Sequence, residues 1–148
     1  MKSKWMTILQ ENGMRITAQR EAIVDILLDS EKALEPIEVY DLTRKEYPSL
    51  GMVTVYRTME CLEELGLLQK VHQESGCNKY LRVKEGHNHL LICSQCGKAV
   101  YFEGLAVETQ FEKIAQQNNF IMHSHWLQLD GLCQQCQGKS KYKKGMKK

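Results

Sequence analysis

The sequence predicts an α+β protein with a helical N-terminal part and a smaller, mixed C-terminal part. Three observations support this class. Apolar residues recur at the helical period as far as Gly66, and two extended segments then flank a Glu74-Ser75-Gly76 turn. Beyond them, strand-like stretches alternate with two Cys-x-x-Cys turns. With 148 residues and 43% hydrophobic content, the chain is long enough to bury a core in one domain or in two small ones.

Short helices and a hairpin are expected first. The expected helices cover residues 3–12, 17–29, 36–47 and 49–65, and the hairpin segments cover 67–73 and 77–83. Gly13 suits a left-handed C-terminal cap, and Thr17 can cap the helix that follows it. Pro36 is placed in the first turn of the third helix, and Pro48 ends that helix.

Helices followed by a hairpin are typical of a winged helix-turn-helix, whose last helix before the hairpin enters the DNA major groove. Thr54, Tyr56 and Arg57 lie outside the apolar stripe of that helix. An Arg can pair with a guanine edge, and a Tyr ring can pack on a thymine methyl group. These residues are candidates for base contacts; the alternative is that they are ordinary surface residues of a core-packed helix. Arg15, just before the second helix, is a candidate for the minor groove.

A second unit is expected beyond a hinge at Glu85-Gly86. Its expected strands cover residues 90–92, 99–102 and 120–130, and its helix covers 107–118. The chain thus divides into residues 1–84, residues 85–138 and a basic, disordered tail over 139–148. The tail holds six of the 20 Lys and Arg and none of the 18 Asp and Glu, so the remainder carries 14 − 18 = −4. A nucleic-acid binder of this kind needs a small basic patch, with the tail as an electrostatic supplement.

The strongest chemical signal is a set of four cysteines, Cys93, Cys96, Cys133 and Cys136. Two residues between cysteines let both thiolates of a turn face one ion, and two such turns complete a tetrahedral sulfur site. Four sulfur ligands leave no open position, which indicates a structural Zn²⁺. The alternative is a dithiol redox pair, as in a thiol oxidoreductase. Cys61 is expected to be a small core residue.

Histidine is the second signal. All five histidines lie beyond the helical part, at His72, His87, His89, His123 and His125. Residues two apart in an extended stretch share a face, so two His-x-His pairs suit a metal with nitrogen and oxygen ligands. His72 and Cys77 flank the tip of the expected hairpin. A thiolate there would favour zinc over Fe(II) or Mn(II).

Three stretches of the sequence occur in a characteristic order. They are residues 13–20 (GMRITAQR), 53–59 (VTVYRTM) and 87–97 (HNHLLICSQCG), followed by the second Cys-x-x-Cys. Over residues 5–137 the chain resembles the ferric uptake regulator (Fur) superfamily, which includes iron, zinc, manganese and peroxide sensors. The resemblance implies a homodimeric, metal-dependent transcriptional repressor and not an enzyme. It also implies that residues 1–84 are a winged-helix DNA-binding domain and residues 85–138 an α/β metal-binding dimerisation domain.

The resemblance further implies roles for single residues. Tyr56 and Arg57 match the family's base-reading pair, and Arg15 matches its minor-groove residue. The four cysteines match its structural zinc site. The expected partner is therefore double-stranded DNA, and two-fold symmetry predicts an operator with an inverted repeat.

The sensed metal is a separate question. Iron and peroxide sensors of the family use a histidine in the loop before the third helix and a carboxylate late in the second wing strand. This chain has no histidine in residues 30–35 and has Tyr80-Leu81-Arg82 in that strand. Lys70-Val71-His72 instead resembles the zinc uptake regulator (Zur) subgroup. We expect regulatory Zn²⁺, with an Fe²⁺-, Mn²⁺- or peroxide-responsive repressor as the alternative. The expected regulatory site consists of His72, Cys77, His87 and His89.

A second family site joins a His-x-His stretch to a glutamate on the C-terminal helix and a histidine on the last strand. Its residues here would be His87, His89, Glu108 and His125, and Glu103 and His123 are further candidates. Because one His-x-His pair precedes Cys93, it cannot fully serve both sites, and the spacing leaves the choice open.

The expected function is repression of metal-uptake genes. An ion that joins the wing, the hinge and the second unit would fix the angle between the two DNA-reading helices of a dimer. No apolar run approaches the roughly 18 residues of a membrane helix, and no secretory signal is visible. A cytoplasmic protein with no membrane partner is therefore expected.

Overall fold

The computed structural model describes residues 1–71, 78–84, 86 and 88–138. His72, Cys77, His87 and the basic tail, on which several predictions depend, lie outside these residues. The chain forms two compact units, Met1–Val83 and Lys84–Lys148, which we call the helical unit and the C-terminal unit. Their helices and strands confirm the predicted α+β class. Within the described part of the chain, no helix combines the length and apolar character that crossing a bilayer requires.

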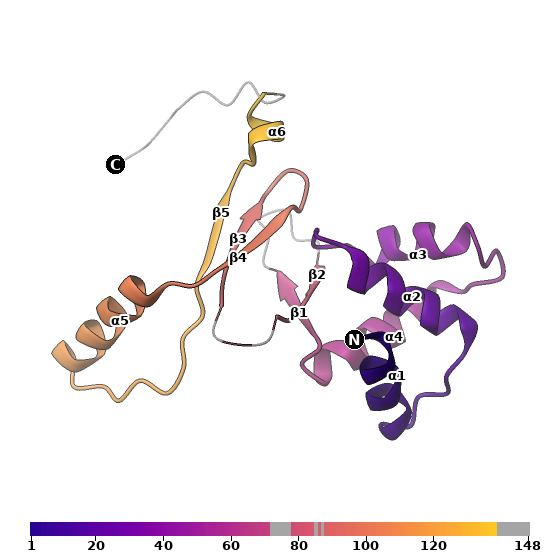
Figure 1. The fold of residues 1–148 in the computed structure, drawn as a ribbon, viewed down its shortest axis with the longest axis horizontal. Helices are drawn as coiled ribbons and strands as arrows, with labels where there is room; N and C mark the ends of the chain where they lie inside the picture. Colours follow the sequence, from indigo (N-terminus) through magenta and orange to yellow (C-terminus); the bar gives the residue numbers. More distant parts are fainter. Residues whose placement is uncertain (72–77, 85, 87, 139–148) are drawn as a thin grey trace. The chain divides into compact units, whose positions relative to one another are not determined.

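The helical unit consists of four helices followed by a two-stranded hairpin (Figure 1). The helices are α1 (Lys2–Glu11), α2 (Ala18–Asp29), α3 (Pro36–Arg44) and α4 (Met52–Glu64), and the strands are β1 (Leu68–Val71) and β2 (Lys79–Arg82). The two strands are antiparallel, with Leu68 opposite Arg82. Leu34, in the loop before α3, exchanges two backbone hydrogen bonds with Tyr80 at 2.9 and 2.8 Å. This is the predicted winged helix-turn-helix order.

Local signals set the ends of these helices. The side chain of Thr17 caps α2 by accepting a hydrogen bond from the backbone N–H of Arg20 at 3.3 Å. Pro36 occupies the first turn of α3, where its missing N–H costs nothing. Gly13 and Gly66 adopt positive φ angles of 81° and 68° after α1 and α4. Both glycines therefore act as the left-handed caps that the sequence predicts.

The core of the helical unit is one apolar cluster to which all four helices and both strands contribute. Its buried members are Trp5, Leu9, Ile23, Val24, Leu27, Leu34, Val39, Leu50, Val55, Met59, Leu62, Leu68 and Tyr80. Burial of one such aliphatic side chain stabilises the fold by about 1.5–3 kcal/mol. Cys61 is half-buried and packs against this cluster, as predicted. The cluster determines which face of α4 is turned outward.

The C-terminal unit is built on a three-stranded sheet in the order β4-β3-β5 (Figure 1). Its elements are β3 (His89–Cys93), β4 (Ala99–Phe102), α5 (Leu105–Gln117), β5 (Gln128–Gly131) and the short α6 (Gln134–Gln137). β3 is antiparallel to β4 and parallel to β5. A parallel pair needs a long connection, and residues 94–127, which include β4 and α5, supply it.

The last strand is shorter than the sequence predicts. Apolar residues from Phe120 onward indicate a strand over 120–130, but only Gln128–Gly131 pairs with β3. Because β3 begins at His89, the residues before β5 find no ladder partner in the part of the chain that is described. Phe120 and Ile121 are 72% and 84% exposed. High strand propensity without a neighbouring strand does not make a strand.

Candidate metal centres and nucleic-acid interface

The four predicted cysteines come together at the C-terminal end of β3. Cys93 ends β3, Cys96 lies in the turn after it, Cys133 precedes α6, and Cys136 lies within α6. Their Sγ atoms all lie within 4.8 Å of one another, and those of Cys96 and Cys133 are 3.7 Å apart. A tetrahedral zinc ion with Zn–S bonds of about 2.3 Å holds its sulfur atoms about 3.8 Å apart. The donor set and its spacing fit a structural zinc ion.

Strand pairing and a tight turn bring these cysteines together. The parallel register places Cys93 opposite Gly131, two residues before Cys133. In the turn after Cys93, Gly97 has a φ of 74°, and its N–H donates to the Cys93 carbonyl at 2.9 Å. Glycine adopts this left-handed conformation without steric cost. The Gly that follows the first Cys-x-x-Cys therefore shapes the site.

Backbone N–H groups favour a thiolate at Cys93. Burial by itself raises the pKa of this thiol, but backbone hydrogen bonds from Cys133, Cys96 and Gln95 outweigh burial and lower the pKa to about 6. The N–H of Cys133 lies 3.4 Å from Cys93 Sγ. Burial, assisted by hydrogen bonds with the neighbouring thiols, raises the pKa of Cys136 to about 12. The thiols therefore do not ionise together until a divalent cation displaces their protons.

A second cluster of metal-ligand side chains consists of His89, Glu108 and His125. One ligand atom from each lies within 4.8 Å of the others. His89 is only 2% exposed, and its Nε2 lies 3.8 Å from Glu108 Oε1. The ring centroids of His89 and His125 are 5.3 Å apart. Two imidazoles and a carboxylate are donors that suit Zn²⁺ or Fe²⁺, and three ligands leave open coordination positions.

Three elements of the C-terminal unit supply this cluster. His89 begins β3, and the N–H of Leu90 donates to the Leu127 carbonyl at 3.1 Å, which holds the segment with His125 beside β3. Glu108 lies in the first turn of α5. Acidic residues are favourable in the first turn of a helix, near the positive end of the helix dipole. Segments that are far apart in sequence therefore converge on one point.

Two phenylalanines pack against the histidines, and the sequence alone did not identify them. Phe102 lies opposite His89 across β3 and β4, and their ring centroids are 5.4 Å apart. Phe111, on α5, lies 4.9 Å from the ring of His125. Such packing restricts the orientation of the imidazoles, as the surroundings of metal ligands commonly do. Phe102 could have been identified only from the register of β3 against β4, which the sequence does not specify.

The predicted regulatory residues have different outcomes. His89 lies with Glu108 and His125, which are members of the second predicted set. Within the described residues, neither Glu103 nor His123 contributes a ligand atom to this cluster. The other members of the two predicted sets lie outside the described residues: His72, Cys77 and His87.

Helix α4 carries the candidate DNA-reading residues. Its buried residues are Val55, Thr58, Met59 and Leu62. Tyr56 and Arg57 are exposed, away from that buried face, and Tyr56 is 45% exposed. Thr54 is half-buried, and its carbonyl accepts a hydrogen bond from the Thr58 hydroxyl at 2.7 Å. Thr58 thus joins the core with its hydroxyl satisfied, which the apolar pattern does not predict.

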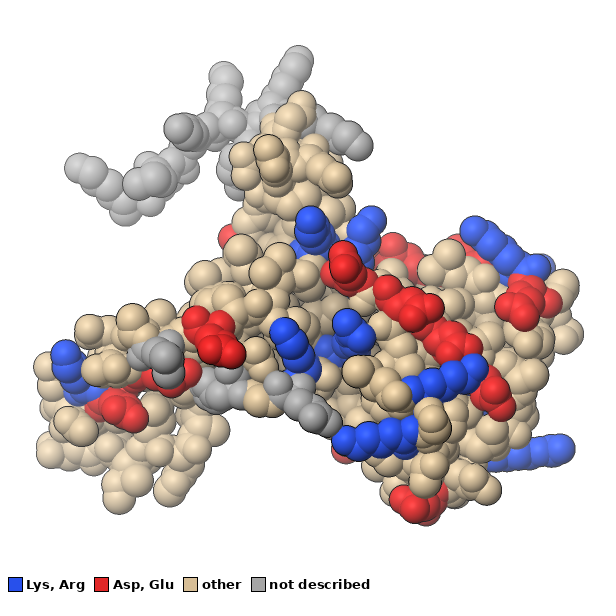
Figure 2. Space-filling model, viewed as in Figure 1, with Lys and Arg blue, Asp and Glu red and all other residues tan. Residues whose placement is uncertain are grey.

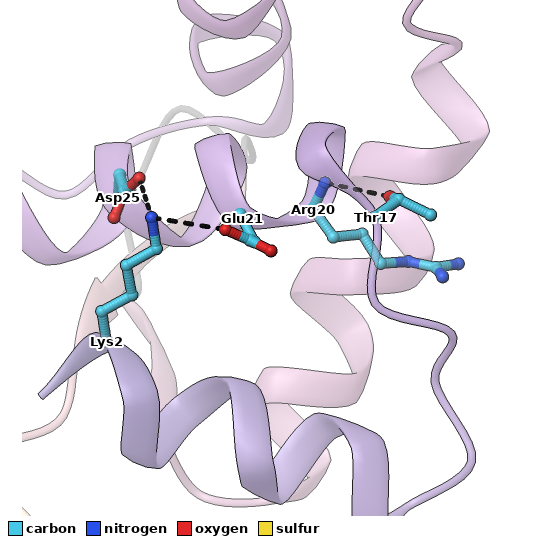
Figure 3. Close-up of polar contacts among 5 residues, drawn as sticks. All are labelled: Lys2, Thr17, Arg20, Glu21 and Asp25. Atoms are coloured by element: carbon cyan, nitrogen blue, oxygen red, sulfur yellow. Dashed lines mark hydrogen bonds and ion pairs between the residues drawn. The ribbon is translucent and has the colours of Figure 1, made fainter.

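The backbone at Arg15 is held by the first turn of α2. Arg15 is exposed in the segment between α1 and α2. The Arg20 guanidinium donates a hydrogen bond to the Arg15 carbonyl. Figure 3 shows Arg20 beside its capping partner Thr17. The same close-up shows the Lys2 side chain between Asp25 and Glu21. The Lys2 ammonium lies 2.6 Å from Asp25 and 3.7 Å from Glu21, so these two carboxylates are partly neutralised.

Basic side chains are not gathered into one large patch on the face in Figure 2. Lys and Arg side chains are interspersed there with Asp and Glu over the helical unit. Some form ion pairs, such as Lys70 with Glu63 at 2.9 Å. This distribution agrees with the net charge of −4 for residues 1–138, which is 14 − 18. DNA affinity would therefore depend on a few outward residues rather than on a basic surface.

The chain is similar in sequence and in fold to proteins of one known family. The sequence model of the Ferric uptake regulator family matches residues 11–130. The Ferric uptake regulation protein of Campylobacter upsaliensis is 34% identical over 142 residues, which cover 95% of this chain and 91% of the relative. That of Bacillus subtilis (strain 168) is 36% identical over 135 residues, which cover 88% and 91%. A solved structure described as a zinc-bound manganese uptake regulator shares 32% identity and a TM-score of 0.73, covering 87% of this chain and 98% of that one.

A winged-helix unit joined to a unit with two metal-ligand clusters defines a metal-responsive DNA-binding regulator. The chain belongs to the ferric uptake regulator family. Members of this family are dimeric transcriptional regulators and not enzymes, which excludes the alternative of a thiol oxidoreductase.

Proposed function

We propose that this chain is a homodimeric, metal-dependent repressor of metal-uptake genes that acts in the cytoplasm. The observation that carries the proposal is the cluster of His89, Glu108 and His125, whose ligand atoms lie within 4.8 Å of one another. This cluster, which we call the histidine–glutamate centre, is the proposed regulatory site. The four cysteines are the proposed structural zinc site. Residues 1–84 are the proposed DNA-binding domain and residues 85–138 the proposed dimerisation domain.

The donor atoms support this division of roles. Four thiolates complete the tetrahedral coordination of an ion, so metal binding is coupled to folding. The apparent binding free energy of structural zinc is about 10–16 kcal/mol. The histidine–glutamate centre has three donors among the described residues, which leaves a coordination position open. An ion bound there can therefore exchange with free ions in solution. A bound ion would supply the positive charge that ties together β3, α5 and the segment before β5. Occupancy of this centre would then be linked to the conformation that binds DNA.

The proposed DNA contacts come from α4 and from the segment before α2. Tyr56 and Arg57 read bases in the major groove, with Thr54 beside them, and Arg15 reaches the minor groove. The exposure of Tyr56, Arg57 and Arg15 supports these roles. A two-fold symmetric dimer would recognise an inverted repeat. The lysines of residues 139–148 would add attraction that does not depend on DNA sequence.

Zn²⁺ is the proposed regulatory ion. A site with imidazole and carboxylate ligands binds Zn²⁺ more tightly than Fe²⁺ or Mn²⁺ in the general affinity order of divalent metals. A solved structure of 32% identity is described as a zinc-bound manganese uptake regulator. Iron is the second candidate, because two relatives of 34% and 36% identity are named ferric uptake regulation proteins. The lack of a thiol among the described members of the histidine–glutamate centre also suits iron.

DNA binding titrated with buffered Zn²⁺, Fe²⁺ and Mn²⁺ tests the proposal. The DNA is a duplex that the metal-loaded protein selects from random sequences, and we expect it to contain an inverted repeat. Binding should appear at the lowest free concentration with Zn²⁺. A response to iron but not to zinc would contradict the zinc assignment, and binding that is independent of all three metals would contradict metal-dependent repression.

Two histidine variants test which residues make DNA binding depend on metal. His125→Ala should abolish the metal dependence of DNA binding and leave one tightly held zinc per chain at the cysteines. His123→Ala removes a nearby histidine that contributes no ligand atom to the described cluster, so it should behave like the parent protein. Equal losses in the two variants would contradict the assignment of the histidine–glutamate centre.

A further inference from the structure

Gly104 lies directly against the imidazole of His89. A methyl group added at Gly104 would lie 2.5 Å from Cδ2 and 2.8 Å from Nε2 of that ring. Real Cβ atoms essentially never approach another heavy atom within 3.0 Å. His89 cannot move aside easily, because it is buried and packs on the rings of Phe102 and His125. A side chain at position 104 and the observed His89 ring therefore exclude each other.

The backbone at Gly104 does not require glycine. Its φ of −125° and ψ of 46° lie on the negative side of φ, which residues with side chains also adopt. Gly104 is the N-cap of α5, a position at which serine, asparagine or aspartate is at least as favourable. At Gly131, in the same unit, an added Cβ would meet no atom within 4 Å. The collision with His89 is therefore the physical reason for glycine at position 104.

Gly104 also begins the turn that carries Glu108. Its carbonyl accepts hydrogen bonds from the N–H of Val107 at 2.8 Å and from the N–H of Glu108 at 3.0 Å. The residue thus contacts one ligand side chain and orients the backbone of another. The two side chains meet with His89 Nε2 3.8 Å from Glu108 Oε1.

We propose that Gly104 is a positioning residue of the histidine–glutamate centre. Because it has no side chain, the His89 imidazole reaches the point where Glu108 and His125 converge. This inference rests on the proposed function of that centre. Relief of the collision requires a shift of roughly 1 Å to reach ordinary contact distance. Metal–nitrogen and metal–oxygen bonds of about 2.0–2.2 Å do not tolerate such a shift without a loss of affinity.

Zn²⁺ competition titrations on the full-length protein test this role. Gly104→Ala adds the colliding Cβ. Gly104→Ser adds the same atom with a better N-cap residue, so a loss in both variants cannot come from a weaker helix start. Gly131→Ala is the matched control. We expect both Gly104 variants to bind the second Zn²⁺ at least about ten-fold more weakly, the scale typical of residues that support metal ligands.

A second measurement separates positioning from a purely structural role. In the His89→Ala background the ring is absent, and the nearest remaining neighbour of the added methyl is Val107 Cβ at 3.7 Å, an ordinary contact. With zinc at the cysteines only, Gly104→Ala should therefore lower the thermal midpoint of the parent protein but not that of His89→Ala. Retention of one zinc per chain reports that each variant has folded.

The outcomes distinguish this inference from the function on which it rests. Parent-like affinity for the second Zn²⁺ in both Gly104 variants would overturn the role of Gly104 and leave the centre intact. A parent protein that binds one Zn²⁺ per chain, with no change in His89→Ala, would overturn the centre and the role of Gly104 together. Additive changes in thermal midpoint would overturn the steric link between positions 104 and 89.

Discussion

The same thiol side chain has different properties at different positions in this protein. Cys61 packs against the core of the helical unit, and burial, together with the charge of nearby Glu64, raises the pKa of its thiol. Cys93 is also buried, yet backbone N–H groups lower its pKa to about 6. Cys61 is therefore a slowly reacting, half-buried residue at the edge of the core, whereas Cys93 readily forms the thiolate that binds a cation.

Alkylation followed by mass spectrometry should separate these cysteines. At pH 8 in the zinc-loaded protein, we expect Cys93, Cys96, Cys133 and Cys136 to stay unmodified. Cys61 should react slowly, because a pKa raised above 9.0 leaves less than about a tenth of it as thiolate, and its rate should rise as the pH approaches that pKa. Chelation of zinc should make Cys93 and Cys133, whose pKa values are lowered, react rapidly without changing Cys61. Rapid modification of the four before chelation would contradict the structural zinc assignment.

Among the elements, α2 joins the stability of the helical unit to the presentation of Arg15. Its cap, Thr17, lies two residues after Arg15, and the Arg20 guanidinium in its first turn holds the Arg15 carbonyl. Thr17→Ala removes the oxygen that accepts the Arg20 N–H and should lower the free energy of unfolding by about 1 kcal/mol. Urea unfolding measures this loss. Thr17→Ser keeps the hydroxyl, so an equal loss in that variant would contradict the capping role.

Helix α4 turns some of its residues toward the core and others toward the solvent. Arg57 is exposed, so Arg57→Ala should leave the fold unchanged. It should weaken discrimination at one base position of the operator by about 1–3 kcal/mol. Binding to duplexes with single base changes measures this effect, and Glu64→Ala, at the exposed end of α4, is the control. A uniform loss across all duplexes would indicate a phosphate contact instead.

Over the whole molecule, the sequence predicts what is determined locally. The caps at Thr17, Gly13 and Gly66 need only their neighbours along the chain, and the winged-helix order follows from them. Each Cys-x-x-Cys turn is also local, and its two cysteines were predicted as ligands, but the parallel pairing of β3 with β5 brings the two turns together. The predicted strand over 120–130 is too long because the length of a strand depends on its partner. The partner here is β3, which is distant in the sequence.

The histidine–glutamate centre was harder to predict because three separate segments form it. From the sequence, His89 is a candidate ligand in two different sites, and the spacing of the histidines does not distinguish between these sites. The parallel register of β3 and β5 places His125 near His89, and the start of α5 places Glu108 there. Gly104 shows the same limit, because its role is visible only as a collision with His89, a residue of β3 that is distant in sequence.

The distribution of charge over the whole chain sets the expected salt dependence of DNA binding. Residues 139–148 contain six lysines, while residues 1–138 carry 14 − 18 = −4. Removal of residues 139–148 should reduce the slope of log affinity against log salt by roughly 0.9 for each phosphate that the tail had neutralised. The decrease in affinity should be large at low salt and small at high salt, with base discrimination unchanged.

A variant with the six tail lysines replaced by glutamine separates charge from chain length. Electrophoretic mobility shifts over a range of KCl concentrations measure both variants, and we expect them to show the same reduced slope. This result follows because counterion release depends on cations near phosphates and not on the length of the chain that carries them. An unchanged slope in both variants would mean that residues 1–138 supply all the cations that neutralise phosphates. The exposed cations of the helical unit would then have to overcome the net negative charge of this part of the chain.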